Sequence, residues 1–330
     1  MSLDLKELVL PRPGRAPSSP RPPIQGPGEA VFVEAFGALL PPAKYLNTDI
    51  GKAAYYELPP SSPGGSLHIP DRVLLVHGIQ TPALGMLPLA RALQTSFPQA
   101  HFVLFDLWGH GLSDAPVVPH DASLFHGLID TLLDHLQWPS AHLVGYSLGG
   151  ALTIGYVASR PSRVQSFTLV APAGLVRSSN FTPEQHGHLR GDDEAAARKW
   201  ILEFLEGGAL VVPADWKERV NRGEVVAEAV KEWEIREHSG HLATVVAIFR
   251  DGGVMDNDAE FARAARTGIP SFVVLGELDN ICSEQQLNEL GFPSVAVVQH
   301  AGHGVVRENV PDVAPLISDF WMKLNGASSG

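Results

Sequence analysis

Apolar stretches of the chain alternate with amphipathic ones, and this order predicts a mostly parallel β-sheet covered by helices on both faces. Nearly continuous apolar runs, typical of strands buried on both faces, occupy residues 72–78, 101–111, 141–147 and 164–172. Residues 82–94 and 123–137 carry apolar side chains at helical spacing. Two further stretches, 30–36 and 53–58, also have the pattern of strands. Buried strands that alternate with helices predict an α/β fold.

The alternation stops near residue 175 and resumes near residue 267. Residues 175–266 contain helical patterns, and one helix start is marked by the capping-box sequence TPEQ at 182–185. Strands are expected again at 270–279 and 294–304, followed by a last helix at 309–324. We therefore expect a core built from residues 29–174 and 267–330. The helical segment 175–266, called the insertion below, is expected as a lid between the sixth and seventh strands.

The N-terminal residues 1–28 have a different composition from the rest. Residues 11–28 hold seven prolines, which lack the backbone donor that a helix or a central strand needs. This segment is expected to be an extended or disordered arm lying across the surface of the protein.

The charge and composition exclude several classes of protein. A formal net charge of −12 disfavours a nucleic-acid-binding protein, which would carry a basic surface. No apolar run approaches the ~18 residues of a spanning helix, so no membrane span is expected. The start MSLDLKELVL does not resemble a signal or transit peptide, which favours a cytoplasmic protein. The single cysteine, Cys282, excludes an internal disulfide.

The stretch GYSLG at 145–149 lies between a predicted strand and a predicted helix. This is the context in which a G-x-S-x-G sequence forms a sharp turn that exposes its serine. Ser147 is therefore predicted to be a nucleophile at the carboxyl end of the sheet, where α/β folds bind ligands. The amide of Leu148, at the start of the following helix, is positioned to stabilise an oxyanion.

A serine nucleophile needs a base, and the chain contains 14 histidines. His303 follows the last predicted strand, at the same end of the sheet as Ser147, and two glycines flank it. It is favoured over His300, which ends the strand. His110, in the sequence GHG, is expected to be a hydrogen-bonded turn residue. His77 is expected to be architectural.

The third catalytic residue should be an acid that orients the histidine. Asp279 follows the strand at 270–276 and is favoured over Glu277, which lies closer to the strand. Asp106 ends another strand and is expected to be structural. A second oxyanion donor is expected from the loop after the strand at 72–77, where Ile79 is the candidate.

Several short sequences together resemble the α/β-hydrolase superfamily: VHGI, DLWGHGLSD, VGYSLGG, LGELD and GHG. The layout is most similar to capped esterases, monoacylglycerol lipase-like enzymes and serine C–C bond hydrolases. The resemblance implies that the catalytic residues follow the chain order Ser147, Asp279, His303. It also implies that the insertion is a helical lid.

These observations predict a hydrolase that cleaves a small or medium hydrophobic ester, lactone or thioester through an acyl-Ser147 intermediate. Two alternatives stay open: a C–C bond hydrolase with the same triad, and a slow or non-catalytic receptor. No cofactor and no metal site are expected, because metal-binding and nucleotide-binding motifs are missing from the sequence. Trp200, Phe204 and Phe249 of the insertion are expected to contact the substrate. The sequence leaves the oligomeric state open.

Overall fold

The structure is a computed structural model that describes residues 8–14, 21–62 and 70–327. An eight-stranded sheet runs through its centre in the order β1-β2-β4-β3-β5-β6-β7-β8. Strands β1 and β2 are antiparallel to their neighbours, and all the other pairs are parallel. The strands are β1 (Lys44–Thr48), β2 (Gly51–Leu58), β3 (Arg72–Val76), β4 (His101–Phe105), β5 (Ala141–Tyr146), β6 (Val164–Val170), β7 (Ser271–Gly276) and β8 (Val295–Val298).

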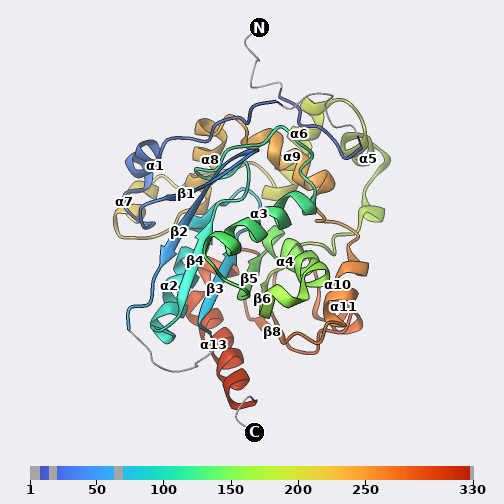
Figure 1. The fold of residues 1–330 in the computed structure, drawn as a ribbon. Coiled ribbons are helices and arrows are strands. Elements are labelled where there is room, and N and C mark those ends of the chain that lie inside the picture. Colours follow the sequence, from blue (N-terminus) through green and yellow to red (C-terminus); the bar gives the residue numbers. More distant parts are fainter. Residues whose placement is uncertain (1–7, 15–20, 63–69, 328–330) are drawn as a thin grey trace.

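Helices cover both faces of this sheet (Figure 1). On one face, α2 (Leu87–Ser96) packs against α13 (Val310–Ala327), and the short 3-10 helix η2 (Ala83–Met86) leads into α2. On the other face, α4 (Leu148–Ser159) packs between α3 (Ala122–His135) and α10 (Asp258–Ala265). The fold is therefore the predicted mostly parallel α/β arrangement.

The burial of β3 explains its continuous apolar sequence. Val73 and Leu75 belong to the apolar cluster under α2 and α13, whereas Leu74 and Val76 belong to the cluster under α3 and α4. Because successive side chains of a strand point to opposite faces, a strand covered on both faces must be apolar at every position.

The prediction of a strand at 30–36 is wrong, because this stretch forms helix α1 (Glu29–Phe36). Its buried side chains, Phe32 and Phe36, lie one helical turn apart, whereas Val31 and Val33 are exposed. Phe32 and Phe36 contact the ring of Trp233, which lies in the insertion, with ring centroids 5.4 and 5.9 Å apart. The β-branched valines suggested a strand, but burial follows the helical period.

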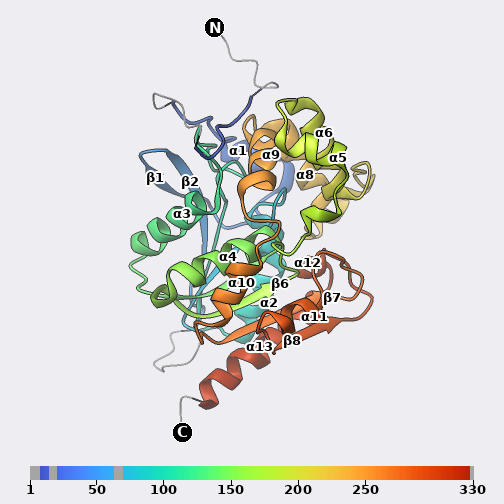
Figure 2. The ribbon, with the colours of Figure 1, turned by 90° about the vertical axis from the view of Figure 1, so that its right-hand side faces the viewer.

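The segment between β6 and β7 contains helices, in agreement with the pattern of its sequence. These are α5 (Pro183–Arg190), α6 (Glu194–Glu206), α7 (Trp216–Asn221), α8 (Ala227–Glu237), α9 (His241–Asp251) and α10. The predicted capping box at the start of α5 is present, with Thr182 and Gln185 bonded to each other's backbone amides. Figure 2 shows α5, α6, α8 and α9 at the end of the molecule opposite α13. Shorter helices α11 (Glu284–Glu289) and α12 (Val305–Glu308) follow β7 and β8.

Part of the N-terminal arm lies within the described residues and is bound to the rest of the chain. Ile24 forms an antiparallel bridge with Ala115 through two backbone hydrogen bonds of 2.9 and 2.8 Å. Arg12 donates to the carbonyl of Gly191, at 2.6 Å, and contacts Glu194 of α6. Residues 1–7 and 15–20 of the arm lie outside the described residues.

Candidate active site

Ser147 occupies the turn between β5 and α4 and has a positive φ of 52°. Few non-glycine residues adopt this conformation, and it persists only where the surroundings hold it. Its amide donates to Val170 at 3.1 Å and its carbonyl accepts from Ala173 at 2.9 Å. A Cβ at Gly145 would collide with the backbone at Gly149. This close approach of strand and helix explains why glycines flank the serine.

Ser147, His303 and Asp279 form one hydrogen-bonded chain. The Nε2 atom of His303 lies 2.9 Å from Ser147 Oγ, and Nδ1 lies 2.8 Å from an Asp279 carboxylate oxygen. Since the carboxylate accepts, Nδ1 carries the proton and the Nε2 lone pair faces the hydroxyl of Ser147. The other oxygen of Asp279 accepts from the Ile281 amide at 3.1 Å, and the side chain is buried. The arrangement has the geometry of a serine, its base and the acid that orients the base.

The rival residues lie away from this chain. The His300 side chain is 92% exposed and lies beside Glu277, with Nδ1 3.5 Å from its carboxylate. Glu277 accepts from the His300 amide at 2.8 Å and so serves the turn after β8. The buried carboxylate of Asp106 accepts from the amides of Ala83 and Leu112. Burial raises the pKa of Asp106 to about 6.

Two further residues support His303 and were not singled out from the sequence. Tyr146 donates its hydroxyl proton to the carbonyl of His303 at 3.1 Å, and its ring lies 5.3 Å from the imidazole. Arg307, from α12, donates to the same hydroxyl oxygen at 3.3 Å. Burial raises the pKa of Tyr146, so the hydroxyl stays a donor. In the sequence, only the position of Tyr146 directly before Ser147 indicated that it could lie at the site.

The two oxyanion candidates lie beside Ser147. The backbone at Gly78 passes so close that a Cβ there would lie 3.1 Å from the Cβ of Ser147. Ile79 follows this glycine, and Leu148 is the first residue of α4. Ile79, Ser147 and Leu148 line the same cavity. Amides at a helix start and on the neighbouring loop are the usual donors to an oxyanion in this geometry.

The cavity above Ser147 has a volume of about 810 Å³, which is enough for a medium-sized organic molecule. Its walls come from the strand ends and from the insertion, which contributes Phe181, Phe204 and Phe249. Trp200 is not among the residues that line it. The Trp200 ring packs against Phe181 and Phe249 instead, with centroids 5.4 and 5.7 Å away.

One part of the cavity wall is charged, which the apolar pattern of the sequence did not indicate. Lys231 of α8 contacts Glu206 of α6 at 2.8 Å, and both side chains are largely buried. Arg307 and Glu228 also line the cavity. Aromatic rings and an ion pair therefore line the same cavity.

The described residues hold neither a cluster of metal ligands nor a membrane-spanning helix. Within this part of the chain, no group of three His, Cys, Asp or Glu side chains is placed to hold a metal ion. No helix there is long and apolar enough to cross a membrane.

The fold and the strand-turn-helix serine are those of the α/β hydrolases. Residues 71–310 match the family described as alpha/beta hydrolase fold, and the chain belongs to this family.

Among its relatives, the dihydrolipoyllysine-residue acetyltransferase component of the acetoin cleaving system of Pseudomonas putida is 29% identical over 67% of this chain. The match covers 56% of the length of that relative. Monoacylglycerol lipase ABHD6 of Mus musculus is 23% identical over 78% of this chain and 77% of its own. The crystal structure of the enol-lactonase from Burkholderia xenovorans LB400 superposes with a TM-score of 0.62. It is 19% identical, and the match covers 84% of this chain and 100% of that one.

Proposed function

We propose that the protein is a serine hydrolase that cleaves a carboxylic ester, lactone or thioester through an acyl-Ser147 intermediate. The observation that carries the proposal is the hydrogen-bonded chain Ser147–His303–Asp279, which opens on the cavity. Two of the similar proteins are named as a monoacylglycerol lipase and an enol-lactonase. Both names describe the hydrolysis of an ester or lactone, which supports the proposal.

The reaction proceeds in two halves. Ser147 Oγ attacks the carbonyl carbon while His303 Nε2 takes the hydroxyl proton, and Asp279 stabilises the resulting imidazolium. The amides of Ile79 and Leu148 donate to the oxyanion. As the intermediate collapses, His303 returns the proton to the leaving oxygen or sulfur and the acyl-enzyme remains. Water then attacks the acyl group by the same route and releases the acid.

The substrate is a small or medium ester or lactone with an apolar part and a polar part. The apolar part packs against Phe204 and Phe249, and the polar part faces the ion pair of Glu206 and Lys231. The insertion acts as a lid, because it forms the wall of the cavity opposite Ser147. Trp200 contributes by supporting the rings of Phe181 and Phe249 rather than by contact with the substrate.

A fluorophosphonate probe and p-nitrophenyl acetate and butyrate test the proposal. The wild-type protein should turn over both esters steadily, and the probe should label Ser147. Ser147→Ala should abolish both signals, whereas Ser159→Ala, at the far end of α4, should leave both unchanged. A single burst without turnover would favour a receptor. Cleavage of a 1,5-diketone in preference to both esters would favour the C–C bond hydrolase.

A further inference from the structure

His77, on the loop after β3, is a buried histidine outside the Ser147–His303–Asp279 chain. The amide of Leu107 donates to its Nε2 atom at 2.9 Å. Because an N–H group can only donate, Nε2 carries no proton and Nδ1 does. Nδ1 therefore donates to the carbonyl of Gly78, 2.6 Å away. This carbonyl belongs to the same peptide unit as the amide of Ile79, the candidate oxyanion donor.

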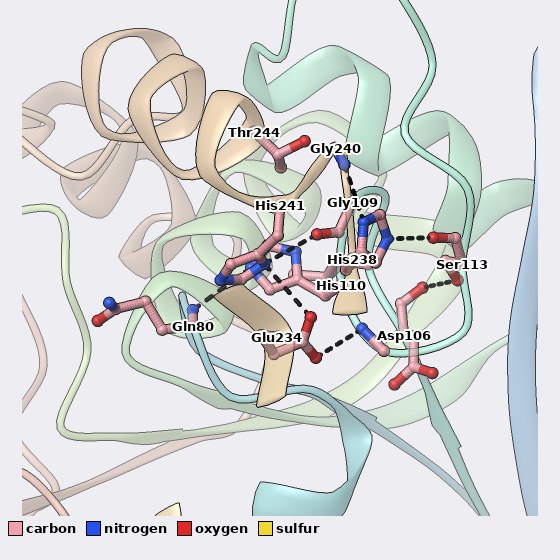
Figure 3. Close-up of polar contacts among 12 residues, drawn as sticks. Gln80, Asp106, Gly109, His110, Ser113, Glu234, His238, Gly240, His241 and Thr244 are labelled. Carbon is pink, nitrogen blue, oxygen red and sulfur yellow. Dashed lines mark hydrogen bonds and ion pairs between the residues drawn. The ribbon is translucent and has the colours of Figure 1, made fainter. Parts of the chain in front are cut away.

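His110, on the loop after β4, holds the next peptide unit (Figure 3). The amide of Gln80 donates to His110 Nε2 at 3.3 Å, so the proton of this ring is also on Nδ1. Nδ1 donates to the carbonyl of Trp108 at 3.1 Å. Gln80 is buried and has a positive φ of 65°, a conformation that a non-glycine residue keeps only when its surroundings enforce it.

The two imidazoles thus hold the peptide units on both sides of Ile79. We infer that His77 and His110, called the histidine clamp below, are positioning residues that aim the Ile79 amide at the oxyanion. The inference deepens the proposed function and rests on it. Because a peptide unit is planar, a hydrogen bond that holds its carbonyl also restricts the direction in which its N–H group points. Preorganised donors of this kind are usually the largest single contribution to catalysis.

Both histidines are built to stay neutral. Burial lowers the pKa of His77 to about 4 and lowers the pKa of His110 well below its ordinary value. The rings lie 5.2 Å apart, so a charge on one would disfavour a charge on the other. A neutral ring is required, since a protonated Nε2 could not accept from an amide.

Helices α8 and α9 hold the loop that carries His110. Glu234 of α8 accepts from the amide of Gly111 at 2.8 Å, and His241 of α9 contacts the carbonyl of Gly109 at 3.0 Å through Nδ1. The His241 ring packs edge-on against His110, with centroids 4.9 Å apart. Figure 3 shows these side chains converging on the loop from the insertion. The helices of the insertion therefore hold the loop that places His110 of the histidine clamp.

Pairs of substitutions at each histidine distinguish the effect of losing a hydrogen bond from the effect of altered packing. His110→Gln places an acceptor near the Nε2 position, whereas His110→Met has similar size and no such acceptor. His77→Asn keeps a donor near the Nδ1 position, and His77→Leu does not. The Met and Leu variants should lose about 10–100-fold in kcat with little change in KM, since a misplaced donor weakens only the transition state. The Gln and Asn variants should recover a large part of the loss.

A trifluoromethyl ketone, which forms an oxyanion on Ser147, gives a second readout. Its inhibition constant should rise by the same factor as kcat/KM falls. The matched control is His142→Met, which removes a buried imidazole at the amino end of β5, hydrogen-bonded to Ser166. The control should lower stability and leave both kcat and the inhibition constant unchanged.

The inference that the histidine clamp positions the Ile79 amide would be overturned by equal kcat values for His110→Gln and His110→Met. Losses of kcat no larger than that of the control His142→Met would overturn it as well. If His110→Met does not fold, His110→Asn replaces it, because its shorter amide does not reach the Gln80 amide. Equal activity of the Asn and Gln variants then has the same meaning. A wild-type protein that neither turns over the esters nor reacts at Ser147 would instead overturn the proposed function, and the inference with it.

Discussion

The two walls of the cavity are built differently. The wall on the sheet side is formed by short loops at strand ends, and its Ser147 is only 5% exposed and held by backbone hydrogen bonds. The wall on the insertion side is formed by side chains of α6, α8 and α9 and of the loop before α5, and its Phe204 is 39% exposed. The aromatic rings of this wall contact one another, with Phe204 and Phe249 5.3 Å apart. The difference suggests that the sheet wall carries the chemistry and the insertion wall selects the substrate.

The largest expected effect lies in the sheet wall. Ser147→Ala and His303→Ala should each lower kcat by roughly 10⁴–10⁶-fold for every substrate, since the residues act as one unit. The double variant should be little worse than either single variant. His300→Ala is the control, and its exposed side chain should be dispensable. Steady-state kinetics with p-nitrophenyl butyrate measure kcat for all four variants. A loss in His300→Ala equal to that in His303→Ala contradicts the assignment of the base.

A smaller loss is expected for the acid of the same wall. Asp279→Asn should lower kcat by roughly 10²–10⁴-fold, because the amide stabilises the imidazolium less and favours the wrong tautomer. Glu277→Gln is the matched control, since its carboxylate bonds the amide of His300 and lies outside the triad. If Glu277→Gln were the more damaging change, the acid would have been assigned to the wrong residue.

In the insertion wall, substitutions should change preference rather than chemistry. Phe204→Ala and Phe249→Ala enlarge the cavity and should shift the relative kcat/KM among chain lengths by about 10–200-fold. Trp200→Ala removes a ring that supports them from behind, so its shift should be smaller. A series of p-nitrophenyl esters from acetate to decanoate measures the preference. If both phenylalanine variants kept the wild-type order of preference among the esters, the insertion wall would not select the substrate.

The smallest effect is expected at the ion pair of the insertion wall. Lys231→Gln leaves Glu206 unpaired in the cavity and should favour cationic over anionic esters by less than about tenfold. Glu206→Gln should shift the preference in the opposite direction. The ratio of kcat/KM for esters of matched length, with a terminal carboxylate or a terminal amine, measures the shift. Changes of the same sign in the two variants would show that the pair acts only in packing.

The sheet wall could be predicted from the sequence in greater detail than the insertion wall. The turn at Ser147 is specified locally, because glycines are needed where β5 and α4 approach each other. His303 and Asp279 could be chosen since loops after parallel strands share one edge of the sheet. By contrast, Trp200 has the same apolar character as Phe204 in the sequence. Which of the two rings faces the cavity depends on how α6 packs against its neighbours.

Helix α1 illustrates the same limit in the core. Its valines have the composition of a strand, yet Phe32 and Phe36 are the buried residues because Trp233 of α8 lies beside them. Tertiary contacts of this kind override local propensity. The charged part of the cavity wall was also invisible, since Glu206 and Lys231 are 25 residues apart and meet only when α6 and α8 pack together.

The sequence by itself determined the alternation of strands and helices, the glycine-flanked turn at Ser147, and the positions of Asp279 and His303 in loops that follow strands. These features depend on short-range patterns: apolar periodicity and the glycines that a tight turn requires. Only the tertiary structure decided that the imidazoles of His77 and His110 face the peptides around Ile79, and that aromatic rings and an ion pair share one cavity. Such contacts join residues from separate loops and helices, and their geometry exists only once the chain is packed.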